Sequence, residues 1–448
     1  MIQTLRRAVA LAAMISALGG GRAARAQDVP WPELAKVAET TLDQLVAGEY
    51  APVIARFNEK MRAAATEDFL RQTMVSLTSQ LGAFKARTGT RTEERNGIRL
   101  VIIGCEFERA GVDAQIAFDV QDRITGLAFR PQAAPAAAYS APPYVNPAAF
   151  KEEDVVVDAG GWPLPGTLSV PAGAGPFPAI VLVHGSGQHD RDETIGPNKP
   201  FRDLAWGLAS RGIAVLRYEK RTRQHQQRVA QLENGFTVKE EAIDDAVAAV
   251  TLLRNRTGLR ADRVYVLGHS LGAMIAPRIA AADPRVAGLV LMAGPVRSLE
   301  QSIVDQIRYL ASVDGTVSPD EQAQIDMADA LFATVRDLKP GDPPIQTMFM
   351  SAPASYWLDL KGYSAPEASR TLTQPMLVLQ GERDYQVTMD DFAVWKKVLG
   401  DGARREYPGL NHLFMPGTGP STGGEYMQPS HVAAAVITDI VTWMGQRN

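Results

Sequence analysis

Ser270 has the sequence surroundings of a serine that acts as a nucleophile. It stands in the stretch VYVLGHSLGA, residues 264–273, with one glycine two positions before it and another two positions after it. This G-H-S-L-G spacing matches the nucleophile elbow, a sharp turn between a strand and a helix that exposes the serine hydroxyl. Small residues are needed there because the turn brings backbone segments together and strains the φ and ψ angles of the serine. A match this short also occurs by chance, so the rest of the chain has to supply the partners.

A serine hydroxyl is a weak nucleophile and needs a general base. Proteins with this elbow carry the serine first, then the acid, then the histidine. Of the 6 histidines, His412 and His431 follow Ser270. His412 lies in YPGLNHLF, a short loop after the last predicted strand, where the base is expected. His431 begins the final predicted helix, where a surface or capping role explains it, so we predict His412 as the base.

The acid that orients this base is expected in the loop after the seventh predicted strand. The stretch QPMLVLQGERDYQV, residues 374–387, offers Glu382 and Asp384. Asp384 fits better because G-x-x-D, with the apolar Val387 three positions later, places its carboxylate beyond the turn. Its role would be to hold the tautomer of His412 and to stabilise the imidazolium.

An oxyanion hole would complete the site. One expected donor is the backbone N–H of Leu271, directly after the serine. The other is expected in the loop VLVHGSGQHDRD, residues 181–192, which follows the third predicted strand of this region. Its H-G start favours the N–H of Ser186, with Gly187 next to it. Each such donor typically contributes a few kcal/mol by meeting the charge that develops on a carbonyl oxygen.

Polar residues crowd the same loop and could be mistaken for a metal site. They are His189, Asp190, Asp192 and Glu193. Because Arg191 and Arg202 are near, a salt-bridged surface turn explains these acids more simply. We therefore predict no metal and no cofactor.

Three cations follow the fourth predicted strand: Arg217, Lys220 and Arg221. They could reach an anionic group of a substrate. Pairing with Asp190 or Asp192 explains them more simply.

The elements that must position these residues alternate between strand and helix from residue 151 onward. Continuous apolar runs such as AIVLV and GLVLM are typical of parallel strands covered on both faces, and the alternation predicts an α/β domain over 151–448. Strands are expected at 154–158, 166–170, 178–183, 212–217, 263–267, 287–293, 375–380 and 403–407. Helices are expected at 200–210, 238–255, 271–282, 388–399 and 430–445.

Residues 298–370 interrupt this alternation with two or three helical segments and no clear strand. An insertion of this length after the sixth strand predicts a helical cap over the C-terminal edge of the sheet. Tyr356 and Trp357, in SAPASYWLDLKGY, could line a substrate pocket there. Packing in the core of the cap is the equally good alternative.

The preceding segment, 27–130, has helical apolar spacing followed by three strand-like runs at 98–107, 112–120 and 124–130. This order predicts a small α+β domain. Residues 131–150 are rich in proline and alanine and nearly uncharged, which predicts an extended linker.

The first 26 residues have the pattern of a secretory signal peptide. Arg6 and Arg7 precede the apolar run AVALAAMISALGG, and ARA at 24–26 fits the cleavage rule. An uncleaved membrane anchor is the alternative, but the run is short for a membrane span. We predict export to the periplasm or the medium. The one cysteine, Cys105, cannot form an internal disulfide and is expected to be a small buried residue.

The composition places the 448-residue chain among globular proteins, with 46% hydrophobic and 21% charged residues and a net charge of -4. Because no Lys/Arg block suggests a nucleic-acid groove, binding to DNA or RNA is not expected. The length favours two domains. No segment after residue 26 reaches 18 apolar residues, so no span is expected in the mature chain.

Taken together, these motifs resemble one known family. HGSGQHDRDETIGPNKPFRDLAWGLASRGIAVLRYEKRT, GHSLGA and LQGERDYQV are similar to the serine esterases of the α/β-hydrolase superfamily, in particular to bacterial EstD-type esterases. The segment 27–130 resembles a domain of unknown function often found ahead of hydrolase domains. The resemblance implies an α/β-hydrolase fold and hydrolysis of small carboxylic esters, best with short acyl chains. Ser270, Asp384 and His412 occupy the matching catalytic positions.

The expected reaction is a two-step acyl transfer through an acyl-enzyme. A serine peptidase or aminopeptidase, a thioesterase and an acyltransferase are alternatives on the same residues. An aminopeptidase needs acids that hold a substrate amine, and those of the cap have surface-like helical spacing: Asp320, Glu321, Asp326 and Asp329. A further alternative, from another class, is a cell-envelope binding protein with a vestigial site.

Overall fold

The structure is a computed structural model that describes residues 31–95, 98–108, 111–131, 139–232, 235–346, 351–399 and 403–446. The predicted signal peptide lies outside these residues. The chain divides into two compact units, Met1–Ala136 and Ala137–Asn448, and each is described by itself.

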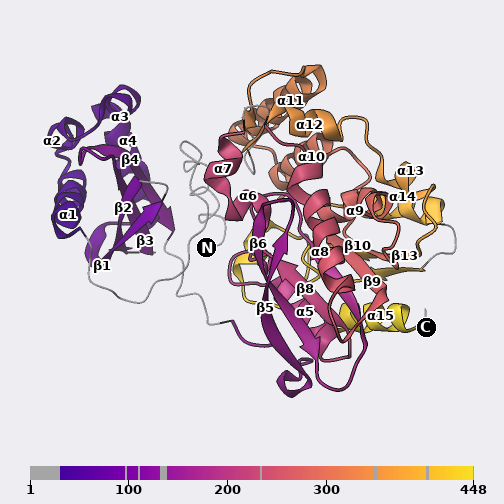
Figure 1. The fold of residues 1–448 in the computed structure, drawn as a ribbon. Helices are drawn as coiled ribbons and strands as arrows, with labels where there is room; N and C mark the ends of the chain where they lie inside the picture. The colour runs from indigo at the N-terminus through magenta and orange to yellow at the C-terminus, as the bar shows by residue number, and fades with distance from the viewer. Residues whose placement is uncertain are drawn as a thin grey trace. The chain divides into compact units, whose positions relative to one another are not determined.

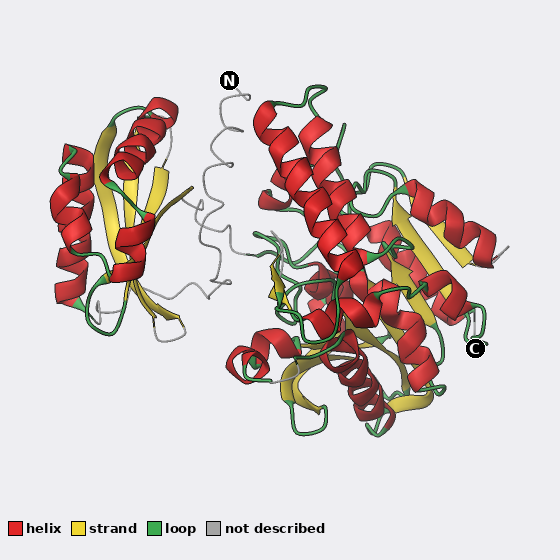
Figure 2. Ribbon diagram, turned by 90° about the horizontal axis from the view of Figure 1, so that it is seen from above, coloured by secondary structure: helices red, strands yellow, loops and turns green. Residues whose placement is uncertain are grey.

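The N-terminal unit packs four helices against one face of an antiparallel sheet with the order β1-β2-β3-β4 (Figures 1 and 2). The helices are α1 (Pro32–Ala47), α2 (Tyr50–Ala55), α3 (Glu59–Ala64) and α4 (Glu67–Leu81), and the strands are β1 (Phe84–Arg95), β2 (Ile98–Phe107), β3 (Gly111–Phe118) and β4 (Ile124–Pro131). The alternate residues Val101, Ile103 and Cys105 of β2 face the helices, so Cys105 is buried as expected.

Strand β1 was missing from the predicted elements. It lies at the edge of the sheet and pairs with β2 alone. Its sequence FKARTGTRTEER has few apolar residues and its described side chains are exposed or half-buried, so no apolar alternation marks it as a strand.

The C-terminal unit is built on an eight-stranded sheet with the order β14-β13-β10-β9-β7-β8-β6-β5. Its strands are β5 (Phe150–Asp158), β6 (Pro163–Pro171), β7 (Phe177–Val183), β8 (Ala214–Tyr218), β9 (Leu259–His269), β10 (Leu289–Met292), β13 (Met376–Gly381) and β14 (Ala403–Tyr407). The six strands from β14 to β8 are parallel, and β6 joins β8 and β5 in antiparallel pairs. The eight strands and their mostly parallel pairing confirm the predicted α/β fold.

Helices cover both faces of this sheet (Figure 2). Strand β7 shows why, because Ala179, Val181 and Val183 point into one core and Ile180 and Leu182 into the other. Helices α8 (Asp244–Arg254), α9 (Leu271–Ala282) and α14 (Met389–Leu399) close the first core, whereas α5 (Pro200–Ala209) and α15 (Ala434–Gly445) close the second.

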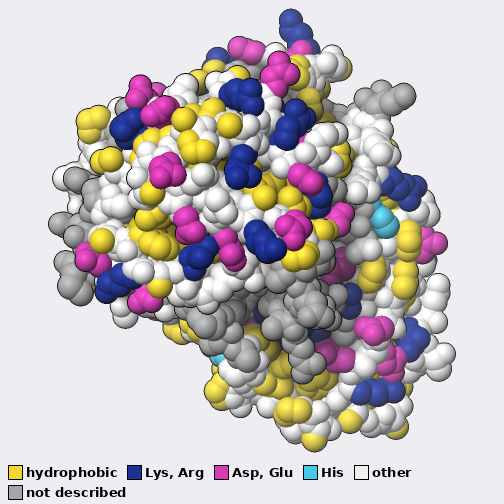
Figure 3. Space-filling view, turned by 90° about the vertical axis from the view of Figure 1, so that its left-hand side faces the viewer, with side chains coloured by type: hydrophobic (Ala, Val, Ile, Leu, Met, Phe, Trp, Pro, Cys, Tyr) yellow, Lys and Arg dark blue, Asp and Glu magenta, His cyan; other side chains and the backbone are white. Residues whose placement is uncertain are grey.

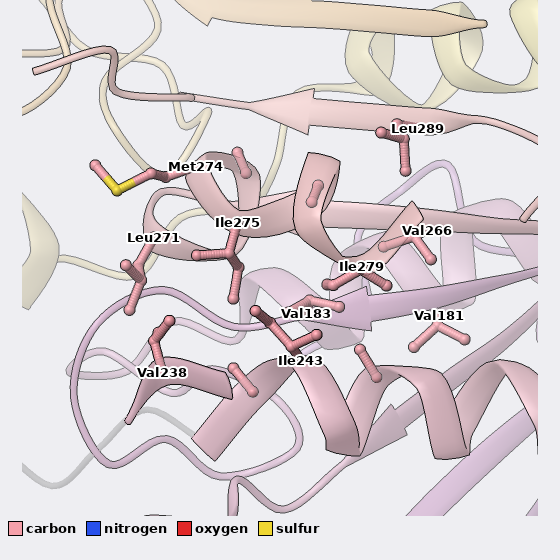
Figure 4. Packing of buried hydrophobic residues seen from close by; sticks show 14 of the residues in the cluster. Val181, Val183, Val238, Ile243, Val266, Leu271, Met274, Ile275, Ile279 and Leu289 are labelled. Atoms are coloured by element: carbon pink, nitrogen blue, oxygen red, sulfur yellow. The ribbon is translucent and has the colours of Figure 1, made fainter. Parts of the chain in front are cut away.

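Helix α9, which directly follows the predicted nucleophile, is anchored deeply in the first core. Ile275 and Ile279 point from it toward β7 and β9, and Leu271 lies beside Val238 (Figure 4). Ile243 reaches this cluster from the π-helical turn η3 (Lys239–Ile243) that precedes α8. Burying these side chains contributes about 2 kcal/mol each. The turn before α9 is therefore held in place by the packing of this helix in the core.

In its described residues, the region predicted as a cap holds four helices rather than two or three: α10 (Leu299–Ser312), α11 (Pro319–Asp337), α12 (Ala354–Leu360) and α13 (Ala365–Ser369). It also holds two two-residue strands where no strand was expected, β11 (Ile345–Gln346) and β12 (Ser351–Ala352), which lie between α11 and α12. Helices α10, α11 and α12 lie together at the top of this unit in Figure 1. The ring of Tyr309 in α10 stacks on Tyr385, which follows β13, with 5.0 Å between ring centroids. This contact places α10 at the C-terminal edge of the sheet.

The segment before β5 differs from the expected extended linker. From Tyr139 onward it packs on the C-terminal unit, where Tyr139 Oη donates to Asp203 at 2.5 Å and Tyr144 Oη donates to the carbonyl of Val432 at 2.8 Å. Two tyrosines in a Pro/Ala-rich segment supply this anchoring, which composition alone does not reveal.

Basic and acidic side chains alternate over the face shown in Figure 3, with hydrophobic atoms between them.

None of the helices in the described ranges is both long and apolar enough to span a membrane.

Candidate active site

Ser270 stands at the turn between β9 and α9, with φ 53° and ψ −116°. A positive φ is uncommon outside glycine and costs energy that the surroundings must offset. A Cβ added to Gly268 would lie 2.2 Å from the carbonyl of Gly272, and one added to Gly272 would lie 2.2 Å from the carbonyl oxygen of Val183. Both glycines are therefore required by close backbone packing, as the motif predicts.

Asp384 and His412 form a buried hydrogen-bonded pair. His412 Nδ1 lies 2.7 Å from Asp384 Oδ2, and both residues are about 5% exposed or less. The other oxygen of Asp384 accepts the backbone N–H groups of Gln386 at 2.8 Å and Val387 at 3.0 Å. These bonds fix the carboxylate and hold the Nδ1–H tautomer of His412, which leaves Nε2 available as a base.

His269 connects this pair to the elbow. Its ring lies 4.8 Å from the ring of His412, and its Nε2 lies 3.0 Å from the His412 carbonyl oxygen. Because His269 directly precedes Ser270, the elbow and the histidine loop are neighbours. In the described part of the chain, the Ser270 hydroxyl and the His412 ring do not form a hydrogen bond. Such bonds are often long without substrate and tighten in the reacting complex.

His269 also forms a buried ion pair with Glu193, 2.9 Å from Nδ1 to Oε2. Both ring nitrogens thus face acceptors, as they do in a protonated imidazole. Burial lowers the pKa of His269, but the charge and hydrogen bond of Glu193 outweigh it and raise the pKa. Burial raises the pKa of Glu193, but the charge and hydrogen bond of His269 outweigh it and lower the pKa to about 2.

The predicted oxyanion loop lies directly against the elbow. A Cβ added to Gly185 would lie 3.3 Å from the Cβ of Ser270. Leu271 is the first residue of α9, so its N–H has no partner within the helix. Ser186 is half-buried and follows Gly185. The loop and the start of α9 therefore both lie next to Ser270.

The acids of this loop are not on the surface, which corrects the expected surface turn. Asp192 and Glu193 are 3% and 1% exposed. Asp192 is ion-paired with Arg217, with Arg202 at 2.6 Å and with Lys199 at 3.2 Å. The salt-bridged character was predicted correctly, but Asp192 is buried, which its three cationic partners make possible.

The other two cations after β8 have partners that the sequence did not indicate. Arg221 is ion-paired with Asp245, and Lys220 Nζ lies 3.5 Å from Glu241 Oε1. Both acids come from the helical segment before β9. Among the described residues, no group of three His, Cys, Asp or Glu side chains is placed to hold a metal ion.

Tyr356 and Trp357, the pocket candidates, are 0% and 1% exposed and belong to the first core of the C-terminal unit. Tyr356 Oη donates to Glu241 at 3.0 Å. This placement favours the packing alternative over a pocket wall.

The two competing candidates for the triad lie elsewhere. Glu382 is exposed. His431 precedes α15 and pairs with Asp203 at 3.2 Å. A structural role for His431 follows from this pairing.

Sequence reasoning missed His269 and Glu193 as neighbours of the nucleophile. A signal for His269 was present, since a polar, titratable residue follows the apolar run VYVLG and a buried polar group requires a partner. The partner, 76 positions earlier in a polar loop, carried no comparable signal.

The sheet order, the strained elbow and the acid and histidine loops at the ends of β13 and β14 define an α/β hydrolase. The model of the alpha/beta hydrolase family matches residues 180–419, and the chain belongs to this family. The model of a second family, described as proteins of unknown function (DUF3887), matches residues 38–127.

Two named proteins are similar in sequence. Esterase EstD of Thermotoga maritima is 37% identical over 407 residues, which cover 90% of this chain and 93% of that protein. The 2,6-dihydropseudooxynicotine hydrolase of Paenarthrobacter nicotinovorans is 27% identical over 154 residues, or 34% of this chain and 37% of that protein. Among solved structures, Est1E from Butyrivibrio proteoclasticus matches with a TM-score of 0.43 and 15% identity, covering 66% of this chain and 98% of its own.

Proposed function

We propose that this chain is a serine hydrolase that cleaves carboxylic esters, most rapidly those with short acyl groups, through an acyl-enzyme intermediate. The observation that carries the proposal is the buried hydrogen bond between Asp384 and His412 beside the elbow of Ser270. The 37% identity to a named esterase over most of the chain supports an ester as the bond that is cleaved.

In the proposed mechanism, Ser270 Oγ attacks the ester carbonyl while His412 Nε2 takes its proton. Asp384 holds the ring and stabilises the imidazolium that forms. The N–H groups of Leu271 and Ser186 stabilise the oxyanion, and His412 then gives its proton to the leaving alcohol. Water, activated by the same histidine, releases the acid from the acyl-enzyme.

Two of the cap acids weighed for the aminopeptidase alternative have structural partners. Glu321 closes the capping box of α11 with Ser318, and Asp329 pairs with Arg308 at 2.5 Å on an exposed face. Acids already used in this way are not arranged to hold a substrate amine.

A rate series tests the reaction class. p-Nitrophenyl esters of increasing acyl length should be hydrolysed fastest at acetate or butyrate, and aminoacyl p-nitroanilides should be poorer substrates. Ser270→Ala should lower kcat by about 10⁴-fold or more, because the nucleophile is lost while binding is retained. Faster turnover of the anilides would contradict ester specificity.

A fluorophosphonate probe separates a hydrolase from a vestigial binding protein. It should label the wild type and not Ser270→Ala. Circular dichroism of both proteins is the control, since a folded wild type that remains unlabelled would favour the binding protein.

We also propose that the chain is exported, on the strength of Arg6, Arg7 and the apolar run that follows them. N-terminal sequencing of the protein from cell fractions should find a mature start near Gln27 in the periplasm or the medium. An intact N-terminus in the membrane fraction would favour the uncleaved anchor.

A further inference from the structure

Three polar groups of the loop beside Ser270 are held by side chains, two of which, Glu193 and Lys220, are buried. The N–H of Gly185 donates to Glu193 Oε1 at 2.7 Å, and the carbonyl of Gly185 accepts from Lys220 Nζ at 2.8 Å. The carbonyl of Ser186 lies 2.6 Å from His189 Nε2. In the described part of the chain, the N–H of Ser186 is not used in a hydrogen bond. The N–H and carbonyl of Gly185 and the carbonyl of Ser186 are thus all held, whereas the Ser186 N–H, the proposed oxyanion donor, is not.

The bond from Lys220 determines where this donor points. The carbonyl of Gly185 and the N–H of Ser186 belong to one planar peptide group, and in a trans peptide they point in opposite directions. Holding the Gly185 carbonyl on Lys220 therefore aims the Ser186 N–H away from Lys220. Gly185 is a neighbour of Ser270, because a Cβ added to it would lie only 3.3 Å from the Cβ of Ser270, so this peptide group lies beside the nucleophile.

The charge of Lys220 adds a second effect. A cation bound to a carbonyl polarises the peptide group and makes its N–H a stronger donor, and this cooperativity grows in a low-dielectric interior. Lys220 is 2% exposed. The position would therefore strengthen as well as orient the donor.

Lys220 is itself fixed by a small buried network. Glu241 Oε1 lies 3.5 Å from Lys220 Nζ and accepts from Thr222 Oγ1 at 2.9 Å. Its other oxygen accepts from Tyr356 Oη at 3.0 Å. Burying a Lys–Glu pair gives little net stability against an apolar pair of the same volume, so packing alone does not explain this arrangement.

We propose that Lys220 is a positioning residue that orients and polarises the Ser186 N–H for the oxyanion, while Glu193 fixes the preceding peptide group. This inference rests on the proposed ester hydrolysis by Ser270. It gives Lys220 a role in the reaction, in place of the two roles considered from the sequence: binding an anionic group of a substrate, or forming an ion pair at the surface.

The test compares Lys220→Met with the matched control Thr222→Val. Thr222→Val removes a hydrogen bond from the same network without touching Gly185. With p-nitrophenyl acetate, Lys220→Met should lower kcat by about 10- to 100-fold, less than or similar to the loss of an oxyanion donor, with KM within about 3-fold of the wild type. Thr222→Val should lower the Tm but keep kcat within about 2-fold.

Inhibition by a trifluoromethyl ketone, which forms a tetrahedral adduct with the serine, gives a second measurement. The inhibition constant of the folded protein does not depend on its stability. Its Ki should rise in Lys220→Met by about the same factor as kcat/KM falls. Lys220→Arg, which keeps a cationic donor, should recover part of the lost inhibitor affinity and part of the lost kcat/KM.

Loss of Lys220 removes the cation that pairs with the buried Glu241 carboxylate, so a second comparison guards against misfolding. The double variant K220M/E241Q removes the pair as a unit and is measured against E241Q alone. An unchanged kcat in K220M or in this comparison, or an equal loss in Thr222→Val, would overturn the proposal. Failure of the proposed function is distinguished, because the wild type itself would then show no Ser270-dependent hydrolysis.

Discussion

Glu193 and His269 show how two buried charges can be stable beside a nucleophile. Each carries a desolvation penalty, and each, at 2.9 Å from the other, shifts the pKa of the other toward its charged form. Glu193 also accepts the N–H of Gly185, so the pair links the oxyanion loop to the strand that ends at the elbow. Its titration should therefore be visible in the stability of the whole unit.

Glu193→Gln keeps an acceptor for Gly185 but removes the charge. The pKa of Glu193 falls from 4.5 to about 2 on folding, which corresponds to about 3 kcal/mol of stability above pH 4.5. This contribution is lost as the pH falls toward 2. The raised pKa of His269 contributes below its unfolded value and is lost as the pH rises through the folded value.

The difference in unfolding free energy between the wild type and Glu193→Gln should thus be largest near pH 5 to 6 and shrink on both sides. Urea denaturation from pH 3 to pH 9 measures it. A difference that does not vary with pH would show that the pair is not ionised.

At the scale of elements, the elbow depends on how closely α9 approaches β7. Gly272→Ala would place a Cβ 2.2 Å from the Val183 carbonyl, where only backbone could move. We expect a loss of about 3 kcal/mol or more in unfolding free energy, or failure to fold, because overpacking against backbone cannot be relieved by a rotamer change. Thermal unfolding measures the effect.

Gly445→Ala is the matched control for this prediction. Gly445 is the last residue of α15, and an added Cβ there would meet nothing within 4 Å. This substitution should be neutral or slightly stabilising. Equal stability of Gly272→Ala and the wild type would contradict the packing of the elbow.

The α/β fold was predictable from the sequence because the central strands are buried on both faces and are therefore continuous apolar runs. Runs such as AIVLV in β7 and GLVLM around β10 are unmistakably apolar. Edge strand β1 has no such signal. The order of Ser270, Asp384 and His412 was also readable, since each sits in a short loop after a predicted strand. The groups around them were not, because Glu193, Lys220 and Glu241 have partners that are distant in the sequence.

At the scale of the whole molecule, every described group of the candidate site lies in the unit Ala137–Asn448. That unit has its own two cores on the faces of one sheet. The N-terminal unit has a separate core and its helices contact its own sheet. The chemistry and the N-terminal unit can therefore be tested independently.

A chain beginning at residue 137 should fold and keep kcat and KM for p-nitrophenyl acetate within about 3-fold of the full chain, because substitutions and deletions outside a site and its core have small effects on it. Starting at 137 keeps Tyr139 and Tyr144, which anchor the segment before β5 on Asp203 and Val432. A chain beginning at residue 150 is the matched control and should lose stability, since it lacks both anchors. Steady-state kinetics and thermal unfolding of the two chains measure this. If the longer chain folds but its kcat falls more than 10-fold, the N-terminal unit contributes to catalysis. That result would contradict the inference that the site works without this unit.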